Sequence, residues 1–411
     1  MNLASKVERY LPRQIRELVT GISQEAGRLG QRTYLVGGVV RDLLLGYPNF
    51  DLDLVIEGDA IGLARQITKT GAIKLVTHPR FGTAKLSCGD FTLDMATARR
   101  ETYARPGALP TVMPGALSDD LFRRDFSINA MAISLASSDY GELIDPYQGK
   151  SDLEHGSIRV LHTESFRDDA TRILRAIRYE QRLGFKLETQ TAQLLKRDIP
   201  MLRTISADRI RHELELILRE KYPEHAIKRL DELGVLQEIN PHLNYNGWIA
   251  GKFDEARKLS KPGQLPSLYL CLLAYRLSEV ENEQLIHRLN LPKKLACILH
   301  HTLRLKSQLP LLGKSPIKGS EIYYLLHEYN PLAIQANAIA SGSPLACSNL
   351  ELFLTKLRYE KTSLNGEKLK GLGIPAGPEL GSILQILHKA KLNGEVKTKA
   401  DEEKLALSLK P

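Results

Sequence analysis

The sequence predicts an α+β protein in which an N-terminal head with a mixed β-sheet is followed by all-α domains. Short runs rich in β-branched and apolar residues, separated by turn residues, are concentrated in the first part of the chain. From Ile199 onward the apolar residues recur at three- and four-residue steps, which is typical of amphipathic helices. A length of 411 residues also exceeds what one core usually serves, so we expect two to four domains.

The composition is that of a globular protein with a basic balance. Hydrophobic residues make up 43% and charged residues 26% of the chain, which permits a large core. A formal net charge of +9 and a pI near 9.2 suit a polyanionic partner without establishing one.

Cysteine usage and hydropathy indicate a cytoplasmic protein. The four cysteines lie far apart and form no C-x-x-C pair, so we expect neither a zinc site nor a disulfide framework. No apolar run reaches the roughly 18 residues of a membrane helix. Residues 1–18 are charged throughout, so we expect no export either. The histidines show no metal-ligand arrangement, and His300-His301 lacks the following aspartate of a phosphohydrolase HD motif.

The first hundred residues predict helices flanking several strands. Residues 1–30 predict one helix, because apolar residues recur at helical steps: Val7, Leu11, Ile15, Leu18 and Ile22. Residues 60–69 predict a second helix. Three β-rich runs then follow at residues 72–77, 83–88 and 91–98.

Residues 33–59 predict a strand, a glycine turn, a helix and a second strand, and they carry the first candidate site. In the second strand Asp51 and Asp53 alternate with leucines, so both carboxylates leave the same face. Adjacent unpaired carboxylates repel each other, and an oxygen-only pair suits Mg²⁺, which completes its shell with water and substrate phosphate. An exposed strand edge with alternating acids is the alternative, because D-x-D patterns are common.

The glycines before this strand favour the metal interpretation. Gly37 and Gly38 lie between a strand and a helix, where backbone N–H groups can approach a phosphate that a Cβ would obstruct. Arg41, one turn into the helix, can add a forked donor to the same anion. A plain strand-to-helix turn is the alternative, although a phosphate cradle beside a carboxylate pair arises by chance less often than either part.

The string LVGGVVRDLLLGYPNFDLD, residues 35–53, resembles the first motif of the class II tRNA nucleotidyltransferase and poly(A) polymerase family. The head of that family belongs to the DNA polymerase beta superfamily. The resemblance implies nucleotidyl transfer with Mg²⁺, with Asp51 and Asp53 as catalytic metal ligands and with Gly38 and Arg41 at the nucleotide. It is strong over residues 33–185 and weak after them.

Asp94 is the candidate third acid. It stands in the run of residues 91–98 with Leu93 and Met95 facing the other way. A third carboxylate on a neighbouring strand, on the side of Asp51 and Asp53, is what two-metal transfer needs as a ligand or proton acceptor. A surface acid on an amphipathic strand is an equally good interpretation.

Residues 98–120 predict a long exposed loop, because prolines and glycines interrupt any periodicity. In the family, a flexible loop at this place accompanies addition of the terminal A. The string RRDFSINAMAI, residues 123–133, resembles the second family motif, which implies a nucleotide-binding role for Arg124; pairing with Asp120 or Asp125 is the structural alternative. Residues 143–161 predict two strands joined by a Pro-Tyr turn.

Residues 166–185 predict a single helix that selects the base. Asp169 and Arg172 are one helical turn apart and present an acceptor and a donor to a planar ligand. Cytosine and adenine show an amino donor beside a ring-nitrogen acceptor, whereas uracil and guanine show a carbonyl beside an N–H, so the pair fits C and A.

This segment resembles the family's E-D-x-x-R motif, in which side chains replace a nucleic-acid template. Asp168 stands where the family usually has Glu, which puts any role of the longer side chain in doubt. Arg175 and Arg178 match further nucleotide-contacting positions of the family. For the whole series of Asp169, Arg172, Arg175 and Arg178, the alternative is an exposed basic helix whose arginines pair with acids.

The resemblance implies four regions: a nucleotidyltransferase head (1–152), a nucleotide-selecting neck (153–218), an RNA-binding helical body (219–306) and a tRNA-binding tail (307–411). It implies CTP and ATP as substrates and the tRNA 3′ end as partner, with CCA addition or A addition as the outcome, and no obligate protein partner is evident. A poly(A) polymerase is the alternative, although those enzymes carry a basic G-R-R-F-like string where residues 78–86 read HPRFGTAKL. The interpretation as a non-catalytic RNA-binding relative is less favoured, because the candidate site residues are all in place.

Overall fold

The computed structural model describes residues 1–48, 51–68, 74–88, 91–108, 110–314 and 316–410. The chain divides into two compact units, the first formed by Met1–Glu213 with Glu232–Glu238 and the second by Leu214–Asp231 with Ile239–Pro411. The finer division into head, neck, body and tail stays a prediction. No described helix is long and apolar enough to cross a membrane.

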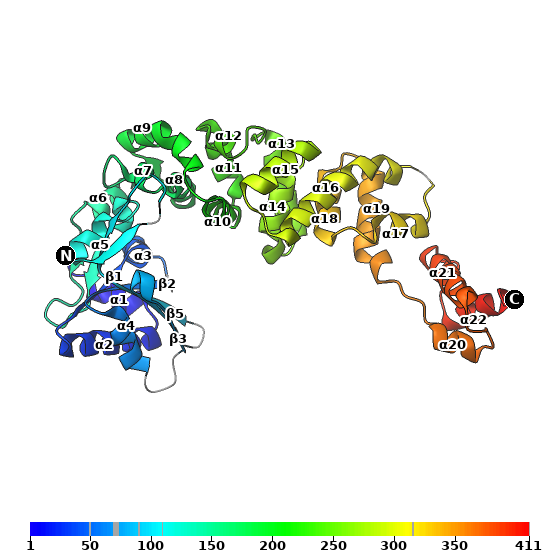
Figure 1. Ribbon diagram of the computed structural model, residues 1–411, viewed down its shortest axis with the longest axis horizontal. Helices are drawn as coiled ribbons and strands as arrows, with labels where there is room; N and C mark the ends of the chain where they lie inside the picture. Colours follow the sequence, from blue (N-terminus) through cyan, green and yellow to red (C-terminus); the bar gives the residue numbers. More distant parts are fainter. Residues whose placement is uncertain (49–50, 69–73, 89–90, 109, 315, 411) are drawn as a thin grey trace. The chain divides into compact units, whose positions relative to one another are not determined.

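The head is built on a seven-stranded sheet with the strand order β3-β4-β5-β2-β1-β8-β9 (Figure 1). β2 and β5 run parallel, whereas the other neighbours run antiparallel, which confirms the predicted mixed sheet. The strands are β1 (Arg32–Val36), β2 (Asp51–Glu57), β3 (Lys74–His78), β4 (Thr83–Cys88), β5 (Phe91–Thr97), β8 (Ala132–Ser134) and β9 (Leu143–Ile144).

The helices of the head pack around this sheet, with α2 and α4 in contact with each other and with its strands. They are α1 (Ala4–Tyr10), α2 (Arg13–Arg28), α3 (Gly38–Leu45), α4 (Ala60–Ile67), α5 (Leu117–Phe122) and α6 (Gly149–Glu154). The prediction of one helix over residues 1–30 is wrong, because the chain is extended at Leu11 and Pro12. Val19 rather than Leu18 is fully buried on the second of these helices.

The prediction of a long exposed loop over residues 98–120 is wrong for its described residues, 98–108 and 110–120, which form a hairpin and a helix. β6 (Arg99–Thr102) pairs with β7 (Thr111–Pro114) in an antiparallel hairpin, and α5 follows. Burial alternates along β6, but all four of its residues are polar, so the sequence shows no alternation of apolar and polar residues there. The tip packs tightly, because a Cβ added at Gly107 would lie 2.3 Å from Oγ1 of Thr204. The predicted strand-turn-strand over residues 143–161 likewise contains a helix, α6.

The predicted single helix over residues 166–185 is broken at Asp169. α7 (Ser165–Asp168) ends there, and α8 (Thr171–Leu183) begins two residues later. Asp169 is extended, and its Oδ1 accepts hydrogen bonds from N and Oγ1 of Thr171 at 3.0 and 2.6 Å. Asp side chains compete for backbone donors in this way, and they then favour a helix start over a helix interior. Asp169 and Arg172 are therefore not two positions of one continuous helix.

The remaining elements of the first unit are largely helical, as predicted. They are β10 (Ser157–Ile158), which pairs in parallel with β11 (Lys186–Leu187), and the helices α9 (Thr189–Asp198), α10 (Ala207–Leu218) and α12 (Val235–Ile239). The ends of α10 and α12 belong to the second unit.

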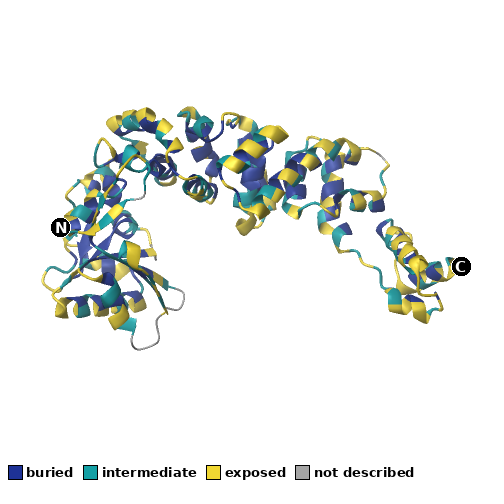
Figure 2. Cartoon of the chain, viewed as in Figure 1, coloured by how far each residue is buried: buried dark blue, intermediate teal, exposed yellow. Residues whose placement is uncertain are grey.

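The second unit is helical throughout the part of it that the structure describes. Its helices are α11 (Pro223–Glu232), α13 (Gly247–Leu259), α14 (Leu265–Ala274), α15 (Glu279–Arg288), α16 (Lys293–Leu312), α17 (Gly319–Leu326), α18 (Pro331–Ala340), α19 (Pro344–Thr355), α20 (Gly366–Gly371), α21 (Pro378–Leu392) and α22 (Lys399–Ser408). Figure 2 shows buried and exposed faces alternating around these helices. One apolar cluster gathers around Leu305 and Leu350, and another around Leu369 and Leu387.

Candidate active site

Three carboxylates share one face of the head sheet. Asp51 and Asp53 alternate with buried leucines on β2, and the parallel register pairs Asp53 with Asp94 on β5. Paired residues of neighbouring strands project from the same face, so the predicted third acid lies beside the first two. Asp94 is also engaged by Lys85 of β4, whose Nζ donates to Oδ2 at 2.8 Å.

Asp53 is partly buried and lies close to other carboxylates, and both features disfavour its ionised form. Burial raises its pKa to about 6; the nearby Arg124 opposes this shift, and the charges of Asp51, Asp94 and Asp120 add to it. A bound cation would relieve the repulsion between the acids. The all-oxygen donor set therefore fits a hard divalent ion.

The carboxylates do not form a closed metal cage. Within the described ranges no three His, Cys, Asp or Glu side chains gather as a ready-made metal site. An ion held by Asp51 and Asp53 would thus take its remaining ligands from water or from substrate oxygens, as Mg²⁺ commonly does.

The glycine turn lies directly against these acids. Gly37 has a φ of +74°, and a Cβ on it would lie 2.6 Å from Nη1 of Arg124 and 3.7 Å from Oδ2 of Asp53. Gly38 is the first residue of α3, so the N-terminus of that helix opens beside the carboxylates. A side chain at Gly37 would displace Arg124, which explains the requirement for glycine there.

Arg124 takes the structural role weighed for it, and it also lies against the glycine turn. Its Nη2 donates to Asp120 at 3.0 Å, as the structural alternative required, while Nη1 reaches toward Gly37. Asp120 is fully buried; its burial alone would raise its pKa, but Arg124 and Arg123 outweigh that effect and lower it. The buried ionised Asp120 therefore anchors the guanidinium of Arg124 at the site.

Arg41 is occupied inside the protein. Only 4% of its surface is exposed, and it donates to Oδ1 of Asp42 and to Oδ1 of Asn129, both at 2.8 Å. Its guanidinium also lies 5.1 Å from the ring centroid of Tyr179. These contacts tie α3 to the following elements, so a contact with a nucleotide would need Arg41 to leave them.

The residues predicted to select the base are held by several partners. Arg172 is buried, and it donates to Oγ of Ser165 at 2.6 Å and to the backbone oxygen of Arg123 at 2.7 Å. Oδ2 of Asp169 accepts a bond of 2.6 Å from Nη2 of Arg209. The side chains of the predicted pair are thus oriented by other residues, while the backbone N–H of Arg172 donates to the backbone oxygen of Asp169 at 3.0 Å.

Arg175 and Arg178 face acids of the same unit. Nε and Nη2 of Arg175 donate to Oδ2 of Asp125 at 2.9 and 2.6 Å, and Arg178 pairs with Glu213 at 3.5 Å. Burial would raise the pKa of Asp125, but Arg175 and the amide of Asn129 lower it to about 2. The pairing with acids matches the alternative weighed for this series, but the helix is not exposed as that alternative required, since Arg178 is buried.

Sequence reasoning missed four residues that complete the site. Arg209 and Lys85 lie outside the motifs. Arg209 reaches Asp169 from 40 residues away in the chain, and Lys85 reaches Asp94 through the register of the neighbouring strands β4 and β5. Asp120 was noticed only as a possible partner. Tyr103 on the hairpin donates to Oε2 of Glu101 at 2.9 Å and lies close enough to Arg172 and Asp169 for their charges to affect its pKa, which burial raises above its usual value.

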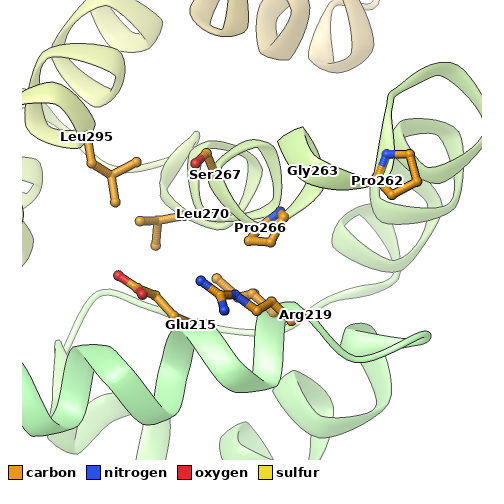
Figure 3. A pocket seen from close by; sticks show the side chains of 9 residues that line it. Glu215, Arg219, Pro262, Gly263, Pro266, Ser267, Leu270 and Leu295 are labelled. Atoms are coloured by element: carbon orange, nitrogen blue, oxygen red, sulfur yellow. The ribbon is translucent and has the colours of Figure 1, made fainter. Parts of the chain in front are cut away.

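The second unit contains a separate cavity of about 540 Å³. Figure 3 shows Glu215 and Arg219 on one side of it and the beginning of α14, with Pro266, Ser267 and Leu270, on the other. It contains none of the predicted site residues.

Comparison with known proteins agrees with the fold, which is a nucleotidyltransferase-type head followed by helical domains. Residues 33–159 match the family described as Poly A polymerase head domain, and residues 184–246 match Probable RNA and SrmB-binding site of polymerase A. The chain is 32% identical to the CC-adding tRNA nucleotidyltransferase of Deinococcus radiodurans, over 96% of this chain and 93% of that protein. It belongs to the tRNA nucleotidyltransferase and poly(A) polymerase family, which confirms the resemblance found in the sequence.

Two further relatives show how far the similarity extends. The A-adding tRNA nucleotidyltransferase of Geobacter sulfurreducens is 35% identical over 98% of this chain, but the match covers 48% of that protein. The chain thus spans about half the length of the A-adding relative. The solved structure of the Thermotoga maritima CCA-adding enzyme complexed with tRNA has a TM-score of 0.77 and 31% identity, with 99% of this chain and 98% of that chain covered.

Proposed function

We propose that the chain is a template-independent tRNA nucleotidyltransferase that adds C and A residues from CTP and ATP to the 3′ end of tRNA. One observation carries the proposal: the acidic face of Asp51, Asp53 and Asp94 lies against the glycine turn and Arg124. The similarity to A-adding, CC-adding and CCA-adding enzymes supports the tRNA substrate. The cysteine usage supports a cytoplasmic location, since the three cysteines with described side chains are free.

Residues of the head would bind and align the reacting groups. Mg²⁺ bound by Asp51 and Asp53 would neutralise charge on the α-phosphate and on the leaving pyrophosphate. The backbone N–H groups at the start of α3, from Gly38 onward, and the guanidinium of Arg124 would hold the triphosphate. Asp94 is the candidate to accept the proton of the attacking 3′-hydroxyl or to complete the metal shell.

Base selection is assigned to Asp169 and Arg172. A carboxylate acceptor and a guanidinium donor match the edges of cytosine and adenine and mismatch those of uracil and guanine. Arg41, Arg175 and Arg178 enter the proposal as residues that shape the pocket, because direct nucleotide binding would require each to leave its present partner.

The decisive experiment offers the purified chain two tRNA substrates, one ending at the discriminator base and one ending in CC, with each nucleotide triphosphate supplied alone and together. A CCA-adding enzyme completes both substrates, whereas an A-adding enzyme extends only the second. Addition of two C residues followed by arrest would identify a CC-adding enzyme. A long A tail on unrelated RNA would favour a poly(A) polymerase, and no incorporation on any RNA would favour a non-catalytic RNA-binding relative.

A further inference from the structure

An exposed cysteine in the second unit lies beside a histidine that the proposed reaction does not use. Cys297 and His301 stand one turn apart on α16, and Sγ of Cys297 lies 3.6 Å from Nε2 of His301. Residues four positions apart on a helix are neighbours on its surface, so the pair is a local feature of α16.

The contact on the other side of the imidazole decides which nitrogen carries the proton. The backbone N–H of Asn330 donates to Nδ1 of His301 at 2.9 Å. A backbone N–H can only donate, so Nδ1 must be the acceptor, and the neutral ring carries its proton on Nε2. Partial burial lowers the pKa of His301, and the charges of Arg304 and His300 lower it further, which keeps the ring neutral. The group facing the sulfur of Cys297 is therefore an N–H donor.

The same contact argues against a metal at this pair. A metal bound through Nε2 of His301 would need a proton on Nδ1, which would then point at the N–H of Asn330. A thiolate at Cys297, in contrast, would accept a hydrogen bond from the Nε2–H group of His301 without any rearrangement.

The other cysteines with described side chains are less accessible than Cys297. Cys271 is fully buried, and burial raises its pKa to about 12. Cys347 is half-buried, and its Sγ donates to the backbone oxygens of Ala338 at 3.2 Å and Ser341 at 3.7 Å. Cys297 differs from both because it is exposed and faces a donor.

The helix face around Cys297 is basic. Lys293 and Lys294 precede it by one turn and are exposed, and His300 and Arg304 follow on the same stretch of α16. One acid moderates this charge, since Glu283 pairs with His300 at 3.2 Å. An electropositive and accessible surface is the environment in which cysteines react, and it attracts an anionic reagent.

We propose that Cys297 is a reactive thiol that forms mixed disulfides with anionic low-molecular-weight disulfides of the glutathione class. The Cys297 thiolate, having lost its proton to solvent, attacks one sulfur of the disulfide. A new S–S bond forms as the old one breaks, and the departing thiolate takes up a proton from solvent. The protein thiol is oxidised and the small disulfide is reduced, so no further oxidant is needed. The inference does not depend on the proposed transferase activity.

The test exposes the full chain, carrying Cys88→Ser, to oxidised glutathione at one neutral pH and follows each cysteine by peptide mass spectrometry. The substitution removes a thiol whose side chain lies outside the described part of the structure. We expect Cys297 to be modified at least tenfold faster than Cys347 and Cys271, because it is exposed and its sulfur faces an N–H donor, whereas the other two thiols are half-buried or buried. Equal rates at Cys297 and Cys347 would overturn the proposal.

Three variants separate the contributions of the histidine donor and of the basic surface. His301→Phe keeps a ring beside Tyr329 but removes the donor, and it should slow modification of Cys297 about tenfold, whereas His300→Ala should leave most of the rate. Lys293→Ala with Lys294→Ala should slow the reaction with oxidised glutathione and not the reaction with cystamine, a cationic disulfide. An unchanged rate in folded His301→Phe, checked by thermal unfolding, would show that the pair plays no part.

Discussion

Arg209 donates from Nη2 to Oδ2 of Asp169 at 2.6 Å, across a separation of 40 residues in the chain. Thr171 engages the other oxygen of the same carboxylate. Asp169 is thus a fixed acceptor whose direction is set by α10 and by the start of α8. Preorganised acceptors discriminate between bases because a mismatched base leaves them unsatisfied.

The first prediction concerns the pair of Asp169 and Arg209. Asp169→Ala should relax the choice of nucleotide, because each good base contact contributes about 1–3 kcal/mol of discrimination. Arg209→Ala should relax it by a smaller factor, since the carboxylate remains but loses its orientation. The measurement is kcat/KM for CTP, ATP, UTP and GTP on the same tRNA. Arg203→Ala is the matched control, because Arg203 forms an exposed pair with Glu238 in the same unit. Unchanged UTP and GTP rejection in both site variants would contradict the assignment.

The second prediction concerns the acidic face. Asp51→Asn and Asp53→Asn should each lower incorporation by several orders of magnitude, because metal alignment and charge neutralisation are lost together. Binding of tRNA should stay close to wild type. Glu17→Gln, which removes an exposed carboxylate paired to Arg13, is the control and should keep full activity. Retention of a tenth of the activity by either aspartate variant would mean that the metal is held elsewhere.

The third prediction concerns pH and Asp53. Its pKa rises from 3.8 to about 6 on folding, so the folded chain binds this proton more tightly than the unfolded chain. The associated stability is fully present below pH 3.8 and is lost as the pH rises through about 6. Two pKa units correspond to roughly 3 kcal/mol as an upper bound.

Denaturant unfolding of the wild type and of Asp53→Asn, in the presence of a chelator, tests this dependence of stability on pH. The free energy of unfolding of Asp53→Asn should exceed that of the wild type by more above pH 6 than near pH 4, and a divalent ion should reduce the difference. A difference independent of pH would show that Asp53 titrates normally.

The fourth prediction concerns the hairpin of β6 and β7. Gly107→Val should displace its tip, because a Cβ meets Thr204 at 2.3 Å and the φ of +72° disfavours a β-branched residue. If the hairpin supports addition of A, ATP use on a tRNA ending in CC should fall more than CTP use. Gly342→Val has open space around the glycine and is the control. An equal loss with both nucleotides would assign the hairpin to general stability.

The fifth prediction concerns the net charge of +9. The affinity for tRNA should fall linearly on a log–log plot against salt, because Lys and Arg contacts to phosphate release counterions. Titrations at four or more salt concentrations measure the slope. A flat plot would show that the basic balance is unrelated to RNA.

The sequence by itself determined the α+β class, the strand-turn-helix-strand of residues 33–59 and the shared face of Asp51 and Asp53. These follow from local periodicity and from glycine, which act over a few residues. The sequence also contains the first motif of the family, and the comparisons confirm that the chain belongs to that family.

The tertiary structure alone decided which charged groups meet. Lys85 reaches Asp94 through strand pairing, and Arg209 reaches Asp169 through the packing of two helices. At Asp169 a local hydrogen bond to Thr171 interrupts the predicted helix, and Arg209 adds a long-range contact to the same carboxylate. In the hairpin of β6 and β7, Gly107 packs against Thr204, which no local pattern indicates. Pairing energies of this kind depend on distance in space, and neither composition nor periodicity encodes that distance directly.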